Sequence, residues 1–237
     1  MLVSISTINT MGTIYIVATP IGNLEDITLR ALRILKEVDL VLCEDTRVTR
    51  KLLSHFDIHV PTQSFHAHST LQKVDQIIEM LKEGKNIALV TDAGTPAISD
   101  PGSLLVGKIR KDLGTDAKVV AVPGASALTA ALSIAGIPGG DFLFLGFLPH
   151  KKGRETLFKE IALTERCVVF YESPHRIIKT LSSLVEHVGN RKVSVGRELT
   201  KIFEEVVEGT PEEVLKYFEI NPDKERGEFV VILWPRA

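Results

Sequence analysis

The sequence predicts an α/β protein with two domains, a mainly parallel sheet in the N-terminal domain and a mixed sheet in the C-terminal domain. In the first half, short β-branched apolar runs alternate with amphipathic helical patterns, which is typical of a parallel sheet covered on both faces. The composition changes around the glycine-rich and proline-rich segment 136–140, which indicates a domain boundary. Further on, two strand patterns follow each other without a helix between them, and this implies an antiparallel pair.

We therefore expect a first domain over residues 12–136 and a second domain over residues 137–237, after an N-terminal extension of residues 1–11. Uninterrupted apolar runs predict strands of the first domain at 13–18, 39–43, 62–65, 87–90 and 118–122. Apolar residues at helical spacing predict its helices over 28–38, 47–53, 74–81, from about 104 to 113 and over 128–135. Gly84 is placed to end the third of these helices.

The second domain shows the same two kinds of pattern with a different order. Strands are expected at 142–147, 167–171, 192–199, 202–208 and 227–233, and helices at 154–164, 177–188 and 211–218. A basic loop over 150–154 follows the first of these strands, and a turn over 172–176 follows the second.

Composition excludes several classes of protein. The chain has 237 residues with a formal net charge of −2, so it lacks the global basic footprint of many nucleic-acid-binding proteins, and any phosphate contacts must be local. Cys43 and Cys167 lie inside apolar runs, which favours reduced core thiols in a cytoplasmic protein, so a zinc site is not expected. No run of about eighteen apolar residues or signal peptide is found, so a membrane location is not expected.

Four expected strands of the first domain end in polar loops, at 20–23, 44–47, 92–100 and 124–126. Strand ends of the same polarity lie along one edge of a parallel sheet, so these loops should converge on one crevice. The longest loop contains two carboxylates, Asp92 and Asp100. Asp100 followed by Pro101 is also a common helix start, and this structural use does not account for the ten residues before it.

The loops lack the motifs of common nucleotide-binding and hydrolytic proteins. The first turn has only Gly22 where a dinucleotide site needs Gly-x-Gly-x-x-Gly, and neither a phosphate-binding loop nor a Gly-x-Ser-x-Gly elbow is present. Backbone amides with few cations suit a compact, nearly neutral or zwitterionic ligand better than a polyphosphate.

Five segments together resemble the bacterial small-subunit ribosomal RNA methyltransferase I family of the tetrapyrrole-methylase superfamily. They are ATPIGNLED at 18–26, CEDTR at 43–47, DAGTPAISDPG at 92–102, VPGASA at 122–127 and FYESPHR at 170–176. The resemblance implies a class III methyltransferase fold that binds S-adenosyl-L-methionine in a cleft between its domains. It also implies 2′-O-methylation of a cytidine in the 16S rRNA of the small ribosomal subunit, by an enzyme that is usually a homodimer.

The resemblance assigns the cofactor contacts by position. They fall on Pro20, Ile21, Asp92, Ala93, Gly94, Thr95, Pro96, Ile98, Ser126, Ala127 and Tyr171, with Leu199 and Gly227 as further candidates. Each glycine could equally be needed only for a turn with positive φ. Replacing Gly94 by valine is expected to abolish cofactor binding and to leave the fold intact.

The transfer needs a base near the hydroxyl group. The candidates are Glu44, Asp45, Asp100 and Glu172, with the loop histidines His66, His68 and His175 behind them. We expect Asp45 and Asp100 to be the catalytic pair. The structural alternatives are a helix cap for Asp100 and an ion pair with Arg176 for Glu172.

Cations that follow two strand ends are candidates for RNA contacts, although short charge runs are more often solvated surface. They are Arg47, Arg50, Lys51, Lys151, Lys152 and Arg154. A small-molecule methyltransferase of the tetrapyrrole type is the alternative function, and a ribosome-binding module without activity is a third hypothesis.

Overall fold

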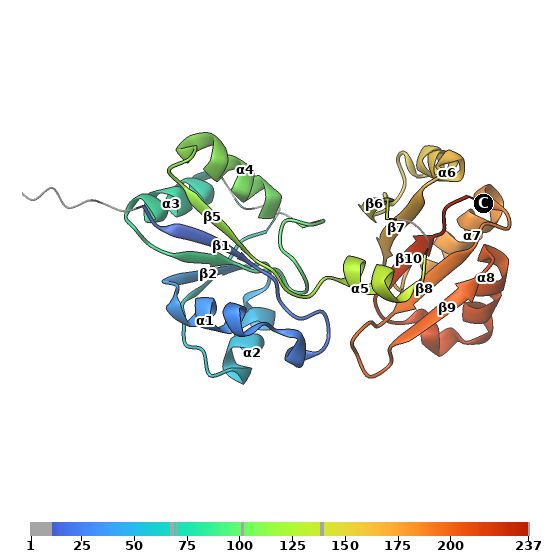
Figure 1. Ribbon diagram of the computed structural model, residues 1–237, viewed down its shortest axis with the longest axis horizontal. Helices are drawn as coiled ribbons and strands as arrows, with labels where there is room; N and C mark the ends of the chain where they lie inside the picture. The colour runs from blue at the N-terminus through green and yellow to red at the C-terminus, as the bar shows by residue number, and fades with distance from the viewer. Residues whose placement is uncertain (1–10, 67–68, 70, 101, 138–139, 237) are drawn as a thin grey trace, which may run out of the picture. The chain divides into compact units, whose positions relative to one another are not determined.

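The computed structural model describes residues 11–66, 69, 71–100, 102–137 and 140–236. They form two compact units, of which the first ends at Ser126 and the second begins at Ala127. Figure 1 shows that each unit is built on its own sheet. None of the helices within the described ranges combines the length and the apolarity that crossing a membrane requires.

The first unit contains a five-stranded sheet in the order β3-β2-β4-β1-β5. Its strands are β1 (Thr13–Val17), β2 (Leu40–Cys43), β3 (Thr62–Ser64), β4 (Ile87–Leu89) and β5 (Lys118–Val122). All neighbouring pairs are parallel, as the sequence predicts. The central strand β4 is buried along its whole length, which explains its uninterrupted apolar sequence.

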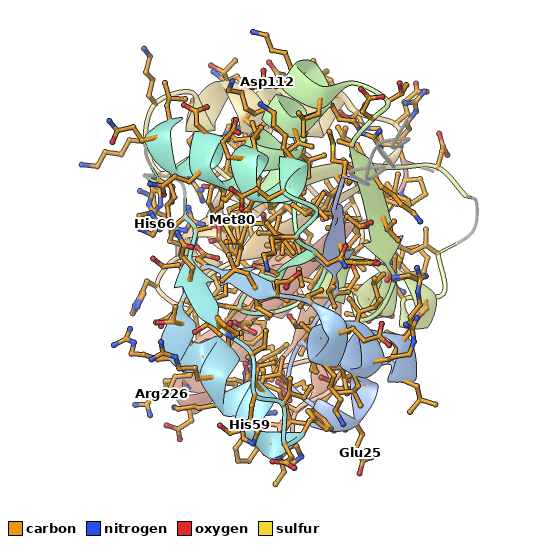
Figure 2. The ribbon with its side chains drawn as sticks, turned by 90° about the vertical axis from the view of Figure 1, so that its left-hand side faces the viewer. Glu25, His59, His66, Met80, Asp112 and Arg226 are labelled. Atoms are coloured by element: carbon orange, nitrogen blue, oxygen red, sulfur yellow. The ribbon has the colours of Figure 1, made fainter. Side chains whose placement is uncertain are left out.

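Helices cover both faces of the first sheet. The helices α1 (Leu29–Glu37) and α2 (Thr46–His55) lie on one face, and α3 (Leu71–Lys82) and α4 (Gly102–Leu113) lie on the other (Figure 1). Each face has its own apolar core, with Leu35 and Leu53 in one and Ile77 and Leu105 in the other. Figure 2 shows Met80 between α3 and the sheet, where it packs against the second of these cores.

The second unit contains a mixed sheet in the order β6-β7-β10-β8-β9. Its strands are β6 (Phe142–Phe147), β7 (Cys167–Glu172), β8 (Val193–Arg197), β9 (Glu205–Gly209) and β10 (Phe229–Leu233). Among the described strands of this sheet, β6 and β7 are the one parallel pair of neighbours, and the predicted antiparallel pair is β8 with β9. One core joins this sheet to α6 (Arg154–Leu163), α7 (Ile177–Val188) and α8 (Pro211–Ile220).

The structure departs from the sequence prediction at the domain boundary and at several element ends, among them the start of β9 at Glu205 instead of residue 202. The units divide between Ser126 and Ala127, whereas the composition placed the boundary after residue 136, because α5 (Ala127–Ile134) contacts β10 of the second unit. Strand β8 ends at Arg197 instead of continuing to residue 199, since Glu198 and Thr200 have positive φ values of 50° and 68° and turn the chain.

Candidate functional site

The four polar loops of the first unit are joined to one another by hydrogen bonds, as the parallel sheet predicts. The loop after β1 meets the loop after β4 through a backbone bridge between Thr19 and Gly94. The amide of Asp45, which follows β2, donates to Asp92 Oδ1 at 3.0 Å. Thr95 Oγ1 donates to the carbonyl oxygen of Ala125, after β5, at 3.2 Å. The loop after β4 therefore contacts all three of the others.

The backbone of the β4 loop is held in unusual conformations. Gly94 is buried with φ of +84°, and a Cβ atom there would lie 3.4 Å from Ile21 Cγ2. Ala97 and Ser99 also have positive φ, at 68° and 62°. Such residues cost about 1–3 kcal/mol each and persist where the surroundings impose them, often at binding sites. The loop is thus shaped at an energetic cost that a simple strand-to-helix turn does not require.

Asp100 has the capping role that the sequence offered as its structural alternative. Its Oδ1 accepts hydrogen bonds from the amides of Ala97, at 2.8 Å, and Gly102, at 2.7 Å. These bonds fasten the end of the loop to the start of α4. Its Oδ2 is buried and has no hydrogen-bond partner within the described residues. Pro101 lies outside the described residues.

Asp45 is occupied by its own helix and by an arginine. Its carboxylate caps α2 by accepting from the amide of Arg47 at 2.8 Å, and Arg47 Nη2 pairs with Oδ2 at 2.6 Å. Hydrogen bonds from the Arg47 side chain and amide lower the pKa of Asp45 to about 2. A carboxylate with so low a pKa is a weak proton acceptor near neutral pH.

Glu44 lies next to Asp45 and has the opposite electrostatics. Its side chain is exposed at the end of β2. Partial desolvation of the carboxyl group raises the pKa of Glu44, and the negative charges of Asp92 and Asp100 raise it further. His66, labelled in Figure 2, and a hydrogen bond with Thr91 oppose this rise. Glu44 thus has a greater affinity for a proton than Asp45. The difference comes from the groups around each carboxylate, and these are brought together only by the fold.

The cofactor candidates in the loops after β1, β4 and β5 fit the group that the family resemblance implies. Pro20, Ile21, Gly94 and Pro96 are buried, Thr95, Ser126 and Ala127 are partly exposed, and Asp92, Ala93 and Ile98 are exposed. The loops 19–23, 92–100 and 123–127 contain no lysine or arginine. Carbonyl oxygens, carboxylates and apolar groups therefore dominate, and this donor set suits a sulfonium cation with an attached amino acid.

In the second unit, Tyr171 belongs to a group of aromatic residues at the β6 and β7 ends. Its ring centroid lies 5.1 Å from that of Phe144 and 5.5 Å from that of Phe147. Phe147 is 56% exposed and was not among the predicted contacts. A glycine with φ of 62°, Gly146, and a register shift between Phe144 and Phe147 produce this arrangement, which a strand pattern in the sequence does not reveal.

The two further cofactor candidates have structural explanations. Leu199 is 6% exposed and packs against the position where Gly196 lacks a side chain. Gly227 has φ of +107°, and a Cβ atom there would lie 2.5 Å from Glu198 Cγ. Both residues therefore shape the turn beside β8, and a ligand role for them stays a prediction.

The candidate RNA contacts differ in how accessible they are. Arg47 and Arg50 are exposed but engaged, with Asp45 and Thr62 respectively, and Lys51, Lys151 and Lys152 are exposed. Arg154 is buried, with 7% exposure, so the expectation that it contacts RNA is corrected. It is the first residue of α6, and its guanidinium is buried, where it donates a hydrogen bond to Thr180 Oγ1.

The remaining base candidates lie elsewhere. Glu172 is 1% exposed and fully engaged, and His175 is exposed on the turn that follows β7. His68 lies outside the described residues. Within the ranges that the structure describes, no three His, Cys, Asp or Glu side chains are grouped so that they could hold a metal ion.

Comparison with known proteins places the chain among methyltransferases. The family model for tetrapyrrole (corrin/porphyrin) methylases matches residues 13–215. The chain is 46% identical to the ribosomal RNA small subunit methyltransferase I of Thermotoga maritima, with 94% of this chain and 98% of that protein covered. It is 48% identical to the protein of the same name from Halalkalibacterium halodurans, with coverage of 94% and 75%.

Solved structures share the fold at low sequence identity. The methyltransferase CobJ superposes with a TM-score of 0.70 and 19% identity, covering 95% of both chains. The uroporphyrin-III C-methyltransferase from Thermus thermophilus gives a TM-score of 0.63 with 19% identity, covering 93% of this chain and 94% of that one. These likenesses concern the fold alone.

Proposed function

Because this chain belongs to the small-subunit ribosomal RNA methyltransferase I family of tetrapyrrole methylases, we propose that it transfers a methyl group from S-adenosyl-L-methionine to RNA of the small ribosomal subunit. The finer form of the proposal is 2′-O-methylation of a cytidine in 16S rRNA. The observation that carries it is the 46–48% identity to relatives of that name over 94% of the chain. The family implies S-adenosyl-L-methionine as the methyl donor. The absence of lysine and arginine from loops 19–23, 92–100 and 123–127 is compatible with this positively charged cofactor.

The β4 loop is the centre of the proposed cofactor site. When bound, S-adenosylmethionine supplies an electrophilic methyl group on a positively charged sulfur. Gly94 allows the backbone to approach the methionine part, and Ile98, which is 47% exposed, offers an apolar surface to the adenosine. In the second unit, Tyr171 stays a predicted cofactor contact, and the rings of Phe144, Phe147 and Tyr171 form an aromatic surface of the kind that adenine stacks on. The loops 19–23, 92–100 and 123–127 contain no lysine or arginine that would repel the sulfonium charge.

We further propose Glu44 as the group that accepts the proton of the ribose hydroxyl. Asp45 and Asp100, the pair expected from the sequence, are committed to caps at the starts of α2 and α4. Glu44 is exposed on the same sheet edge as the β4 loop, and its raised pKa makes it the better proton acceptor. A base of this kind typically contributes about 10²–10⁴-fold to the rate.

A methyl-transfer assay tests the function directly. The protein is incubated with labelled S-adenosylmethionine and either unmethylated small ribosomal subunits or porphyrinoid precursors. We expect label in the 16S rRNA, and nuclease digestion with mass spectrometry should place it on a cytidine ribose. Transfer to the porphyrinoid alone would support the alternative function, and absence of cofactor binding by calorimetry would support a ribosome-binding module.

The role of Glu44 is tested with a matched pair of variants. Glu44→Gln should lower the rate of the chemical step by about 10²-fold or more while cofactor affinity stays unchanged. Glu83→Gln changes another exposed glutamate, just after α3, and should have no effect. Equal rates for the two variants would remove Glu44 from the mechanism. A homodimer, also implied by the family, stays a prediction that light scattering can test.

A further inference from the structure

A buried carboxylate in the second unit organises a network of polar side chains. Glu172, the last residue of β7, is 1% exposed. Its Oε1 accepts from the amide of Ser173 and pairs with Arg176 Nη2, both at 2.7 Å. Its Oε2 accepts from Thr180 Oγ1 at 2.6 Å. All three of these partners belong to the turn after β7 or to α7.

Arg154 joins this network from α6. Its Nη2 donates to Thr180 Oγ1 at 2.7 Å, and its guanidinium lies 4.9 Å from the centre of the Phe158 ring. Burial lowers the pKa of Arg154, and the negative charge of Glu172 opposes this shift. One buried carboxylate therefore compensates two guanidinium groups, those of Arg154 and Arg176.

Both arginines also bind the chain that leaves β6. Arg176 Nη1 donates to the carbonyl oxygen of Leu148 at 2.8 Å, and Arg154 Nη1 reaches that of Pro149 at 3.4 Å. These two carbonyl groups directly precede His150, Lys151 and Lys152, which are all exposed. At the other end of this basic segment, Gly153 has φ of +80° and leads into α6. The amide of Arg154 donates to the carbonyl oxygen of Lys151 at 3.2 Å, so the segment is held at both ends while its side chains are exposed.

Stability alone does not explain such a network. Buried ion pairs often contribute no more than apolar side chains of similar volume would, because desolvation offsets the attraction. The same elements are already joined by the apolar core that includes Leu148, Phe158, Ile177 and Leu181. The polar groups add directional hydrogen bonds to the carbonyl groups of Leu148 and Pro149, which an apolar core cannot provide.

We propose that the network of Glu172, Thr180, Arg154 and Arg176 positions the basic segment 150–152 so that Lys151 and Lys152 meet RNA phosphates. Arg154 and Arg176 are positioning residues in this account and do not touch the RNA. The inference rests on the proposed RNA substrate, and it adds which buried groups determine how the RNA contact is presented. A preformed segment binds more tightly because less conformational entropy is lost on binding.

Amide hydrogen exchange tests the positioning without any substrate. Thr180→Val removes the hydroxyl group that joins Arg154 to Glu172 and keeps the side-chain shape. Arg176→Lys keeps the positive charge opposite Glu172 but loses the guanidinium group that bonds to both Glu172 and the Leu148 carbonyl. This second variant is used if Thr180→Val folds poorly. We expect exchange of the Arg154 amide, which donates to the carbonyl oxygen of Lys151 at 3.2 Å, to rise about tenfold or more in either variant. Thr164→Val, which removes a hydroxyl bonded to the Glu160 carbonyl in the same unit, is the control and should leave exchange of the Arg154 amide unchanged.

A double-mutant cycle on RNA affinity tests the purpose of the positioning. Affinity for unmethylated small ribosomal subunits is measured for Thr180→Val, for Lys151→Gln with Lys152→Gln, and for the combination. We expect each change alone to weaken binding about tenfold, and the combination to weaken it far less than the product, since a displaced segment makes less use of its lysines. A purely structural role predicts independent effects that multiply, and that result would overturn the inference.

The two proposals fail in different ways. If the wild-type protein transfers no methyl group to ribosomal subunits, the proposed function is wrong, and the exchange experiment still decides whether the network holds the segment. If transfer occurs but exchange of the Arg154 amide is the same in Thr180→Val and Thr164→Val, the function stands and the positioning inference is overturned.

Discussion

The amide of Thr19 donates to the carbonyl oxygen of Gly94 at 2.9 Å, and the amide of Gly94 donates back to the carbonyl oxygen of Thr19 at 3.0 Å. This reciprocal pair connects the loop after β1 to the loop after β4, two segments that are 75 positions apart. Thr19 Oγ1 strengthens the connection by donating to the carbonyl oxygen of Thr91 at 3.0 Å. The pair fixes the position of Gly94 within the proposed cofactor site.

Gly94→Ala should weaken both cofactor binding and the fold. At φ of +84° a non-glycine residue costs roughly 1–2 kcal/mol, so the sequence-based expectation that the fold stays intact in Gly94→Val needs this correction. Gly114→Ala is the matched control, because Gly114 has φ of +58° and open space around it. We expect both variants to lose similar stability in urea, and only Gly94→Ala to lose S-adenosylmethionine affinity by calorimetry. Equal cofactor affinity in the two variants would remove Gly94 from the site.

Asp92→Asn should shift the pH profile of methyl transfer to lower pH. After desolvation, the charge of Asp92 is the largest cause of the raised pKa of Glu44, with Asp100 next and His66 opposing. The base must be ionised, so a raised pKa places the acid limb of the rate profile above the ordinary glutamate value of about 4.3. Removing the Asp92 charge lowers the pKa of Glu44 and extends activity to lower pH. Rates measured under single-turnover conditions between pH 5 and 8 check the direction of this shift, and an unmoved acid limb would contradict it.

Asp45→Ala should destabilise α2 without abolishing the chemical step. The variant loses the hydrogen bond to the Arg47 amide and the pair with its guanidinium. We expect the melting temperature to fall by about 2–4 °C, the range for a modest loss in a chain of this size. Single-turnover rates should stay within about threefold of the wild type, well above those of Glu44→Gln. A loss of rate as large as in Glu44→Gln would restore Asp45 as the base.

Charge reversal at Lys151 and Lys152 should weaken RNA binding in a salt-dependent way. Each lost phosphate contact reduces the slope of log affinity against log salt by about 0.7–0.9. The control reverses Arg110 and Lys111, two exposed cations at the end of α4. Both double variants change the net charge equally, so only a local contact distinguishes them. We expect the first to lose affinity for small ribosomal subunits at constant cofactor affinity, and similar losses in both would indicate a general charge effect.

Cys167 should make the protein less stable in alkali. The thiol is 2% exposed, and burial raises its pKa to about 11. The unfolded thiol ionises near pH 8.5, so between that pH and about 11 the unfolded state binds fewer protons than the folded state. The free energy of unfolding therefore falls as pH rises through this window. Urea titrations of the wild type and Cys167→Ala at pH 8 and pH 10.5 should show a smaller pH effect in the variant, and parallel curves would refute it.

Much of the fold could be predicted because the periodicity of apolar residues is a local property of the chain. The run at 87–89 is apolar without interruption, and it is the central strand of a sheet covered on both faces. The convergence of loops followed from the topology alone, since parallel strands end at one edge. The boundary between the units was less predictable, because the small residues of α5 do not reveal that the helix contacts β10.

For the site, the sequence by itself determined which loops meet and which residue types they bring: glycine and carboxylates after β4, cations after β2 and β6. Only the tertiary structure decided what each side chain does there. Asp45 and Glu44 are adjacent carboxylates, yet contact with Arg47 lowers the pKa of one, while partial burial and the fields of Asp92 and Asp100 raise that of the other. In the sequence, Arg154 follows two lysines and looks like a surface cation. In the structure it is buried, because its guanidinium bonds to Thr180 inside the second unit. Proton affinity and burial depend on neighbours that are distant in the chain, and no local pattern records them.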